Sequence, residues 1–118
     1  MKFSHVTISV RNLDESLEFY KSVIGLPVNR RFSAGDSEIA FLGNGETEIE
    51  LICNKSHSDV LIGQDISLGF TVASLQEISS RLIQMGIEPG EVLQPNPQVM
   101  FFFIADPNGV RVQFVEHL

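Results

Sequence analysis

An imidazole and a carboxylate on two predicted strands have the clearest chemical potential in this sequence. His5 lies in an alternating stretch over residues 3–10, and Glu50 lies in a second one over residues 47–54. Such a pair can ligate a divalent metal ion or hold and move a proton. Each shares its predicted strand face with an apolar residue, whereas a solvated face would be more uniformly polar. The plain alternative for His5 is a solvent-facing position on its strand.

Other candidate groups carry less chemistry. Glu48 has the same parity as Glu50 and is predicted to be an exposed carboxylate. His57, Asp59 and His117 fall in a linker or at the terminus, where a metal role is not expected. Cys53 is the single cysteine, so no internal disulfide can form, and it is predicted to be buried and inert. We find no glycine-rich phosphate loop, CxxC or GxSxG motif.

Two similar stretches must position these side chains. Residues 3–10 alternate between apolar and polar side chains, as a strand does. Asn12 can then cap a helix that ends at Gly25. The apolar stripe of this helix is Leu13, Leu17, Tyr20 and Ile24. Residues 66–86 repeat this plan, with Ser74 and Glu77 as a capping box and Gly86 as the stop. The repetition predicts a duplicated unit.

Three extended runs follow each helix. The first half has them at residues 27–33, 37–42 and 47–54, and the second half at 91–94, 98–105 and 110–116. Residues 95–97 and the D-P-N-G sequence at 106–109 are predicted turns. Each half is therefore βαβββ, and for the first we expect a small curved antiparallel sheet with its helix on one face.

Size and charge limit the function classes. The chain has 118 residues and a net charge of −7, with 15 acidic against 8 basic residues. This length favours a single domain over residues 1–118, with modules at about 1–54 and 66–118 and a polar linker at 55–65. The acidic balance argues against nucleic-acid or anionic-membrane partners. The lone cysteine and the lack of signal-type or spanning apolar runs favour a cytoplasmic protein.

The paired modules, the D-P-N-G turn and the early histidine are together similar to the vicinal oxygen chelate superfamily. That group includes glyoxalase, bleomycin-resistance and fosfomycin-resistance proteins, methylmalonyl-CoA epimerase and extradiol dioxygenases. The resemblance covers essentially the whole chain. It implies an α+β fold in which two βαβββ modules form a curved mixed sheet around a cavity, closed within one chain or across a homodimer. It also implies a divalent metal in the cavity.

The resemblance carries four metal positions onto this sequence. His5 and Glu50 match those of the first module. In the second module, Ser67 stands where glyoxalase-like members have His, and Gln113 stands where most metal enzymes have Glu. A neutral hydroxyl and a neutral amide oxygen are weak ligands, so we expect tight zinc or nickel binding to be absent. The expected cofactor is either none or a weakly held divalent metal on His5, Glu50 and Gln113.

An apolar wall with a few polar groups is the usual make-up of a small-molecule site. Phe103 resembles the cavity-lining aromatic residue of the family. Alternation along the predicted strand 98–105 places Phe101 on the same face as Phe103 and Phe102 on the opposite face. The phenylalanine run is nevertheless a core feature first. The predicted ligand-binding residues are His5, Thr7, Glu50, Ser67, Phe101, Phe103 and Gln113.

Three functions are compatible with this set. We favour a bleomycin-resistance-like protein that binds a small organic molecule beside a degenerate metal site. The first alternative is a metal-dependent lyase, isomerase or epimerase of glyoxalase type, in which Glu50 is the catalytic proton carrier. The second is a structural or regulatory protein that kept the fold without a ligand. Whether the protein is an enzyme, and which ligand it takes, stay open at this point.

Overall fold

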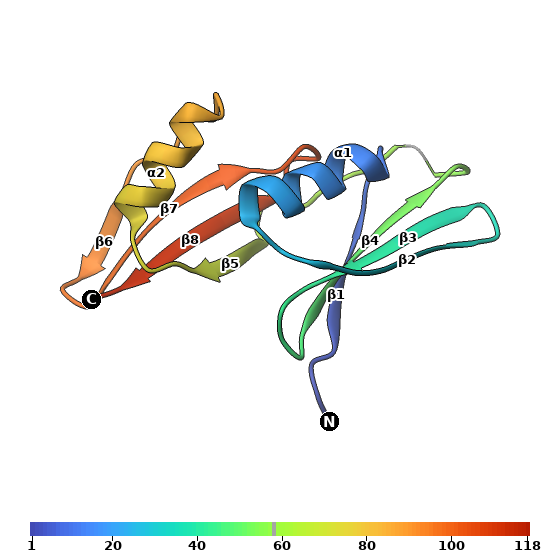
Figure 1. Ribbon diagram of the computed structural model, residues 1–118, viewed down its shortest axis with the longest axis horizontal. Coiled ribbons are helices and arrows are strands. Elements are labelled where there is room, and N and C mark those ends of the chain that lie inside the picture. Colours follow the sequence, from blue (N-terminus) through green and yellow to red (C-terminus); the bar gives the residue numbers. More distant parts are fainter. Residues whose placement is uncertain (58) are drawn as a thin grey trace. The chain divides into compact units, whose positions relative to one another are not determined.

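The computed structural model describes residues 1–57 and 59–118. The chain forms two compact units, unit 1 (Met1–Leu61) and unit 2 (Ile62–Leu118), each with its own four-stranded sheet (Figure 1). Both units have the order strand, helix and three strands, so the predicted α+β fold with two βαβββ modules is confirmed. The predicted linker at 55–65 includes residue 58, which lies outside the described residues.

Unit 1 contains a mixed sheet. Its elements are β1 (His5–Ser9), α1 (Leu13–Glu18), the π-helix η1 (Phe19–Ile24), β2 (Val28–Ala34), β3 (Ser37–Leu42) and β4 (Glu48–Asn54). The strand order is β1-β4-β3-β2, with β1 parallel to β4 and the other pairs antiparallel. The expectation of an antiparallel sheet in this half was therefore wrong at β1. The helical crossover after β1 lets the chain re-enter the sheet in the same direction.

The first helix changes its winding halfway along. Asn12 caps α1 by accepting a 2.9 Å hydrogen bond from the amide of Glu15, as the sequence predicted. The helix then continues as η1 and ends at Gly25, which has φ 90° and donates its amide to the carbonyl of Tyr20. The predicted stripe missed Phe19, which is buried next to Tyr20 in this wider π-helical turn.

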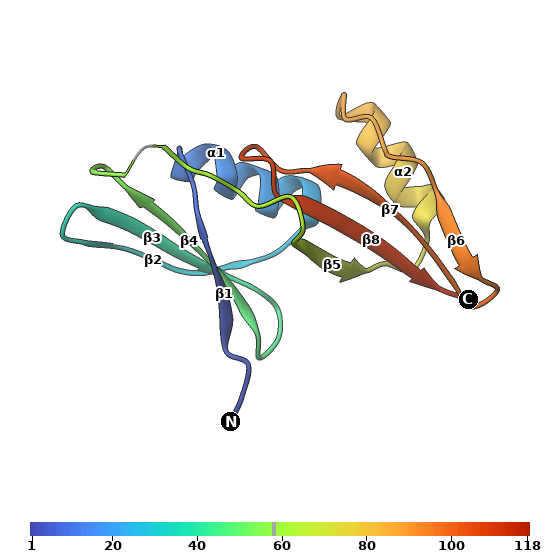
Figure 2. The same cartoon turned by 180° about the vertical axis from the view of Figure 1, so that it is seen from behind.

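Unit 2 repeats the plan. Its elements are β5 (Ser67–Thr71), α2 (Leu75–Gln84), β6 (Leu93–Asn96), β7 (Val99–Ala105) and β8 (Arg111–His117). The order is β5-β8-β7-β6, with β5 parallel to β8. Figure 2 shows β1 beside β4 and β5 beside β8 from behind. Ser74 caps α2 through the amide of Glu77 at 3.2 Å, which confirms the predicted capping box.

The strand β6 begins and ends two residues later than the predicted range 91–94. It includes Pro95 and Asn96, and the turn falls at residues 97–98. Proline is tolerated here because β6 is an edge strand, where a missing amide costs no ladder hydrogen bond. The side chain of Asn96 then accepts a 2.8 Å bond from the amide of Gln98 and shapes the turn.

One face of each sheet is buried. In unit 1 the buried face carries Ile8, Ile49 and Leu51, and the helix buries Leu13, Leu17 and Tyr20. In unit 2 the corresponding residues are Phe102, Val112 and Phe114 on strands and Leu75 and Leu82 on α2. Alternation sends the next residues of each strand to the opposite side. We call that side the open face of the unit: it carries His5, Thr7, Arg30, Phe41, Glu48 and Glu50 in unit 1, and Ser67, Gly69, Phe101, Phe103, Arg111 and Gln113 in unit 2.

The D-P-N-G turn is held by its aspartate. Asp106 is buried, and its Oδ1 accepts hydrogen bonds of 2.8 Å from the amides of Asn108 and Val110. This turn sets the start of β8. Cys53, by contrast, is only partly buried, and its thiol lies 3.5 Å from the carbonyl oxygen of Arg11. Among the described residues, no helix is long and apolar enough to cross a membrane.

Candidate functional site

The strand pairing of the two units matches residue by residue. In unit 1, His5 is opposite Glu48 and Thr7 is opposite Glu50. In unit 2, Ser67 is opposite Arg111 and Gly69 is opposite Gln113. His5 and Ser67 therefore hold equivalent places in the repeat, and so do Glu50 and Gln113.

The same register extends to the third strand. Phe41 pairs with Glu50 on one sheet, and Phe103 pairs with Gln113 on the other. Each unit thus places an aromatic ring beside the side chain that occupies the last predicted ligand position. The residue opposite the first predicted ligand position differs in charge between the units. It is Glu48 in unit 1 and Arg111 in unit 2.

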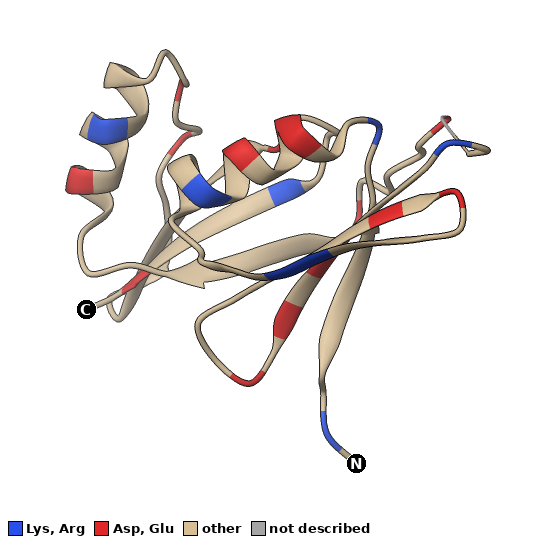
Figure 3. Ribbon diagram, turned by 45° about the vertical axis from the view of Figure 1, so that its right-hand side comes forward, with Lys and Arg blue, Asp and Glu red and all other residues tan. Residues whose placement is uncertain are grey.

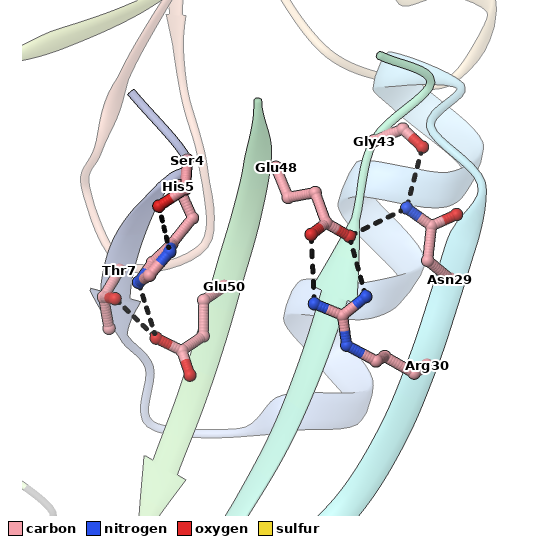
Figure 4. A network of polar contacts seen from close by, with 8 residues as sticks. All are labelled: Ser4, His5, Thr7, Asn29, Arg30, Gly43, Glu48 and Glu50. Carbon is pink, nitrogen blue, oxygen red and sulfur yellow. Dashed lines mark hydrogen bonds and ion pairs between the residues drawn. The ribbon is translucent and has the colours of Figure 1, made fainter. Parts of the chain in front are cut away.

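The open face of unit 1 brings three predicted site residues together. Oε1 of Glu50 accepts a 2.5 Å hydrogen bond from the hydroxyl of Thr7 and lies 3.8 Å from Nε2 of His5 (Figure 4). Nδ1 of His5 is 3.2 Å from Oγ of Ser4. The Glu50 side chain keeps 16% of its exposure and the His5 side chain 41%. An oriented carboxylate beside an imidazole can hold a cation or exchange a proton with a bound molecule.

Glu48 is fixed rather than free. Arg30 donates two hydrogen bonds to its carboxylate, at 3.0 and 3.2 Å, and Asn29 donates a third at 3.0 Å (Figure 4). These donations from Asn29 and Arg30, with the nearby positive charge of Arg30, lower the pKa of Glu48 from its ordinary value of 4.5. The expectation of a simple exposed carboxylate was wrong, since the Glu48 side chain retains 18% of its exposure.

Phe41 forms an aromatic floor between these groups. Its ring meets the His5 ring edge to face at 5.8 Å and stacks on Phe32 at 6.3 Å. The guanidinium carbon of Arg30 lies 4.1 Å from the Phe41 ring centre. Imidazole, carboxylate and guanidinium therefore surround one apolar surface, which suits an organic ligand with a few polar groups.

The open face of unit 2 carries the other four predicted residues. Phe101 and Phe103 meet edge to face at 5.7 Å, and Ser67 and Gln113 lie on the neighbouring strands β5 and β8. The side-chain oxygen of Gln113 lies over Gly69, where an added Cβ would be 3.3 Å away from it. Arg111 places its guanidinium carbon 4.2 Å from the ring centre of Phe103. The absence of a side chain at Gly69 leaves room for the amide of Gln113.

The donor chemistry of these residues does not fit a tight metal site. Within residues 1–57 and 59–118, no group of three or more His, Cys, Asp or Glu side chains is placed to share a metal ion. His5 and Glu50 are the two strong donors of the predicted set, and the equivalent places of unit 2 hold the neutral oxygens of Ser67 and Gln113. Neutral oxygens suit a hard cation better than zinc or nickel.

Sequence reasoning gave no role to Arg30, Phe41 or Arg111, which also lie on the open faces. Alternation in the last strand places Arg111 on the face of Gln113, but only its side-chain contact with Phe103 singles it out. Phe41 could have been found by aligning the third strand of each half. No sequence signal indicated that Arg30 and Asn29 would converge on Glu48, because β2 and β3 slip in register between Val28 and Arg30. That the two open faces meet in one cavity stays a prediction.

A family model covers nearly the whole chain. The model of the Glyoxalase/Bleomycin resistance protein/Dioxygenase superfamily matches residues 2–114. Among solved structures, a glyoxalase family protein from Bacillus cereus is similar with a TM-score of 0.84 and 25% identity, covering 100% of this chain and 95% of that one.

Three curated relatives match this chain over nearly their full length. The uncharacterized protein YwbC of Bacillus subtilis is 30% identical, with 98% of this chain and 97% of that protein covered. A probable lactoylglutathione lyase of Synechocystis is 26% identical, over 95% of this chain and 92% of the relative. A lactoylglutathione lyase of Neisseria meningitidis is 27% identical, over 98% and 91%.

Proposed function

Because the chain belongs to the Glyoxalase/Bleomycin resistance protein/Dioxygenase superfamily, we propose that it binds a small organic molecule in a cavity between its two βαβββ modules, beside a degenerate metal site. The observation that carries the proposal is the matched register of the two sheets. It gives Ser67 and Gln113 the places that His5 and Glu50 have in unit 1. The second half thus keeps the frame of the repeat and carries a neutral hydroxyl and a neutral amide oxygen at these two places.

The roles of the residues follow from their contacts. Phe41, Phe101 and Phe103 supply apolar surface for the ligand. Glu50, held by Thr7, and His5 supply a carboxylate and an imidazole from unit 1. Ser67 and Gln113 supply neutral hydrogen-bonding groups from unit 2. We further propose a homodimer and a cytoplasmic location, in keeping with the family resemblance and the single cysteine.

A second candidate is a lyase of the glyoxalase type. The observation in its favour is that relatives at 26% and 27% identity are lactoylglutathione lyases by name. In this reading His5, Glu50 and Gln113 would hold a hard divalent cation, which would supply polarisation of a carbonyl group when bound. Glu50 would then carry the proton, since Thr7 fixes the orientation of its carboxylate.

Elemental analysis and ligand screening separate these functions. The purified protein is analysed for bound metal, assayed for lactoylglutathione turnover with added divalent ions, and heated in the presence of a library of small organic molecules. We expect metal well below one equivalent and a raised Tm with at least one compound, because a ligand specific for the native state stabilises it. Stoichiometric metal with turnover would favour the lyase. A Tm that no compound raises would favour a structural or regulatory protein.

A further inference from the structure

The open face of unit 2 holds an arginine, Arg111, without an ion-pair partner among residues 1–57 and 59–118. Unit 2 has two lysine or arginine residues in the sequence, Arg81 within α2 and Arg111 at the start of β8. Figure 3 colours lysine and arginine blue. In the part of the chain that the structure describes, no carboxylate lies within ion-pair distance of Arg111, and its guanidinium lies over the ring of Phe103. The strand residues that share this face include no Asp or Glu.

In unit 1 the arginine that lies over the corresponding phenylalanine, Arg30, already has a carboxylate partner. Arg30 lies over Phe41 as Arg111 lies over Phe103, at 4.1 and 4.2 Å from the ring centres. Arg30 also donates both arms of its guanidinium to Glu48, whereas the place of Glu48 in unit 2 is the one that Arg111 itself occupies. Each unit therefore places an arginine over a phenylalanine ring. In unit 1 this arginine is paired with Glu48, whereas the described residues give Arg111 no such carboxylate.

We propose that Arg111, with Ser67 and Gln113 beside it, binds the oxyanion of a small organic ligand, borne on a carboxylate or a phosphate group. This proposal rests on the proposed function and specifies its ligand class. A guanidinium stacked on a ring keeps its N–H edge free, and that edge matches two oxygens of a carboxylate or phosphate. Ser67 is opposite Arg111 in the sheet, and Gln113 follows two residues later on the same face.

The ring system beside the guanidinium explains why the anion would belong to an organic molecule. Phe103 touches Phe101 at 5.7 Å, and both rings lie on the open face next to Gln113. A ligand with an apolar body and an oxyanion at one end could place its body on these rings and its charge against Arg111. The net charge of −7 does not oppose this, because the strand face around Arg111 carries no acid.

Three probes that share a phenyl ring test the proposal: benzoate, phenyl phosphate and the neutral benzamide. Each is titrated into isotope-labelled protein while the backbone amide resonances of β5, β7 and β8 are followed. We expect benzoate or phenyl phosphate to shift these resonances and to bind about tenfold or more tightly than benzamide, because a charge-assisted bidentate contact is lost in the amide. The anion that binds better identifies the source of the oxyanion.

Two variants and a matched control locate the effect. Arg111→Gln should abolish the preference over benzamide, and Arg111→Lys should keep part of it, because lysine retains the charge without the planar fork. Arg81→Gln removes the same charge from α2 and should keep the full preference.

Equal affinity for benzoate and benzamide would overturn the anion proposal and leave the small-molecule proposal standing. Unchanged benzoate binding in a folded Arg111→Gln variant would overturn it too. If none of the three probes shifts the three strands, the anion site is refuted, and the library screen alone then decides the broader function.

Discussion

The hydroxyl of Thr7 donates a 2.5 Å hydrogen bond to Oε1 of Glu50, a residue 43 positions later in the chain. This bond crosses from β1 to β4 outside the backbone ladder and orients the carboxylate that faces His5. We predict that a double-mutant cycle of Thr7→Val and Glu50→Gln gives a coupling free energy of about 1 kcal/mol. This is less than a buried hydrogen bond to a carboxylate would give, because solvent reaches this one. Urea denaturation measures it. Thr7→Ser keeps the donor and should preserve the wild-type stability, and a coupling of zero would contradict the assigned orientation.

Glu48 should make stability depend on acid pH. Its folded-state pKa lies below 4.5, mainly because Asn29 and Arg30 donate to it, so its contribution is present above pH 4.5 and is lost as pH falls through the folded value. We predict that Glu48→Gln lowers Tm at neutral pH and flattens the loss of Tm between about pH 5 and 3. The exposed Glu46 lies in the turn before β4, and Glu46→Gln is the matched control. Parallel melting curves for wild type and Glu48→Gln over that range would refute the prediction.

The buried acceptor of the D-P-N-G turn should be worth more than a surface bond. Asp106→Ala leaves the amides of Asn108 and Val110 without the oxygen that both now reach at 2.8 Å. We expect a loss of about 3 kcal/mol in the free energy of unfolding, since each buried unsatisfied donor costs about 1–3 kcal/mol. Asp106→Asn keeps an acceptor oxygen and should lose far less. If the two variants unfold at the same urea concentration, the negative charge rather than the acceptor matters.

Gly90 supports the backbone of Phe103. Its amide donates a 3.1 Å hydrogen bond to the carbonyl of Phe103, and an added Cβ would lie 2.5 Å from that oxygen. Since a backbone oxygen cannot turn away, Gly90→Ala must displace β7, and we predict a loss of about 2 kcal/mol. Gly63→Ala is the control, because nothing lies within 4 Å of a Cβ there. If both variants have the same free energy of unfolding by chemical denaturation, the displacement of β7 does not destabilise the fold and the prediction is wrong.

Restoring the missing donors should create a metal site. We predict that Ser67→His combined with Gln113→Glu yields tight binding of zinc or nickel, because four strong donors would then occupy the matched places of the two units. Isothermal titration with the metal ion measures the gain, and each single variant serves as a control. A double variant that folds but gains no affinity would contradict the proposal that the four places meet in one cavity.

Most of the fold could be predicted from local sequence patterns. Alternation located the strands, Asn12 and Ser74 marked the helix starts, and Gly25 and Gly86 marked the stops. The π-helical turn at Phe19–Ile24 was missed because a stripe of spacings three and four reads the same for an α-helix. The strand through Pro95 was missed because an edge position, which the sequence does not show, makes proline tolerable.

The four candidate site positions came from the family resemblance. It placed His5 and Ser67 on the first strand of each half and Glu50 and Gln113 on the last, and the strand register gives the members of each pair equivalent places. The pairing of Glu48 with Arg30 was not predictable, because it depends on a register slip between β2 and β3. The stacking of Arg111 on Phe103 depends on a side-chain rotamer, which no spacing rule fixes.

The register match has an evolutionary consequence. Gly69 pairs with Gln113 as Thr7 pairs with Glu50. A substitution at one codon can therefore give one half the functional group that the other half has at the equivalent place, without any insertion or deletion in a strand. A lineage carrying this duplicated frame can therefore gain or lose a carboxylate, an imidazole or a guanidinium at one locus while the ladder beneath it stays intact. Diversification of ligand preference would then proceed much faster than diversification of architecture.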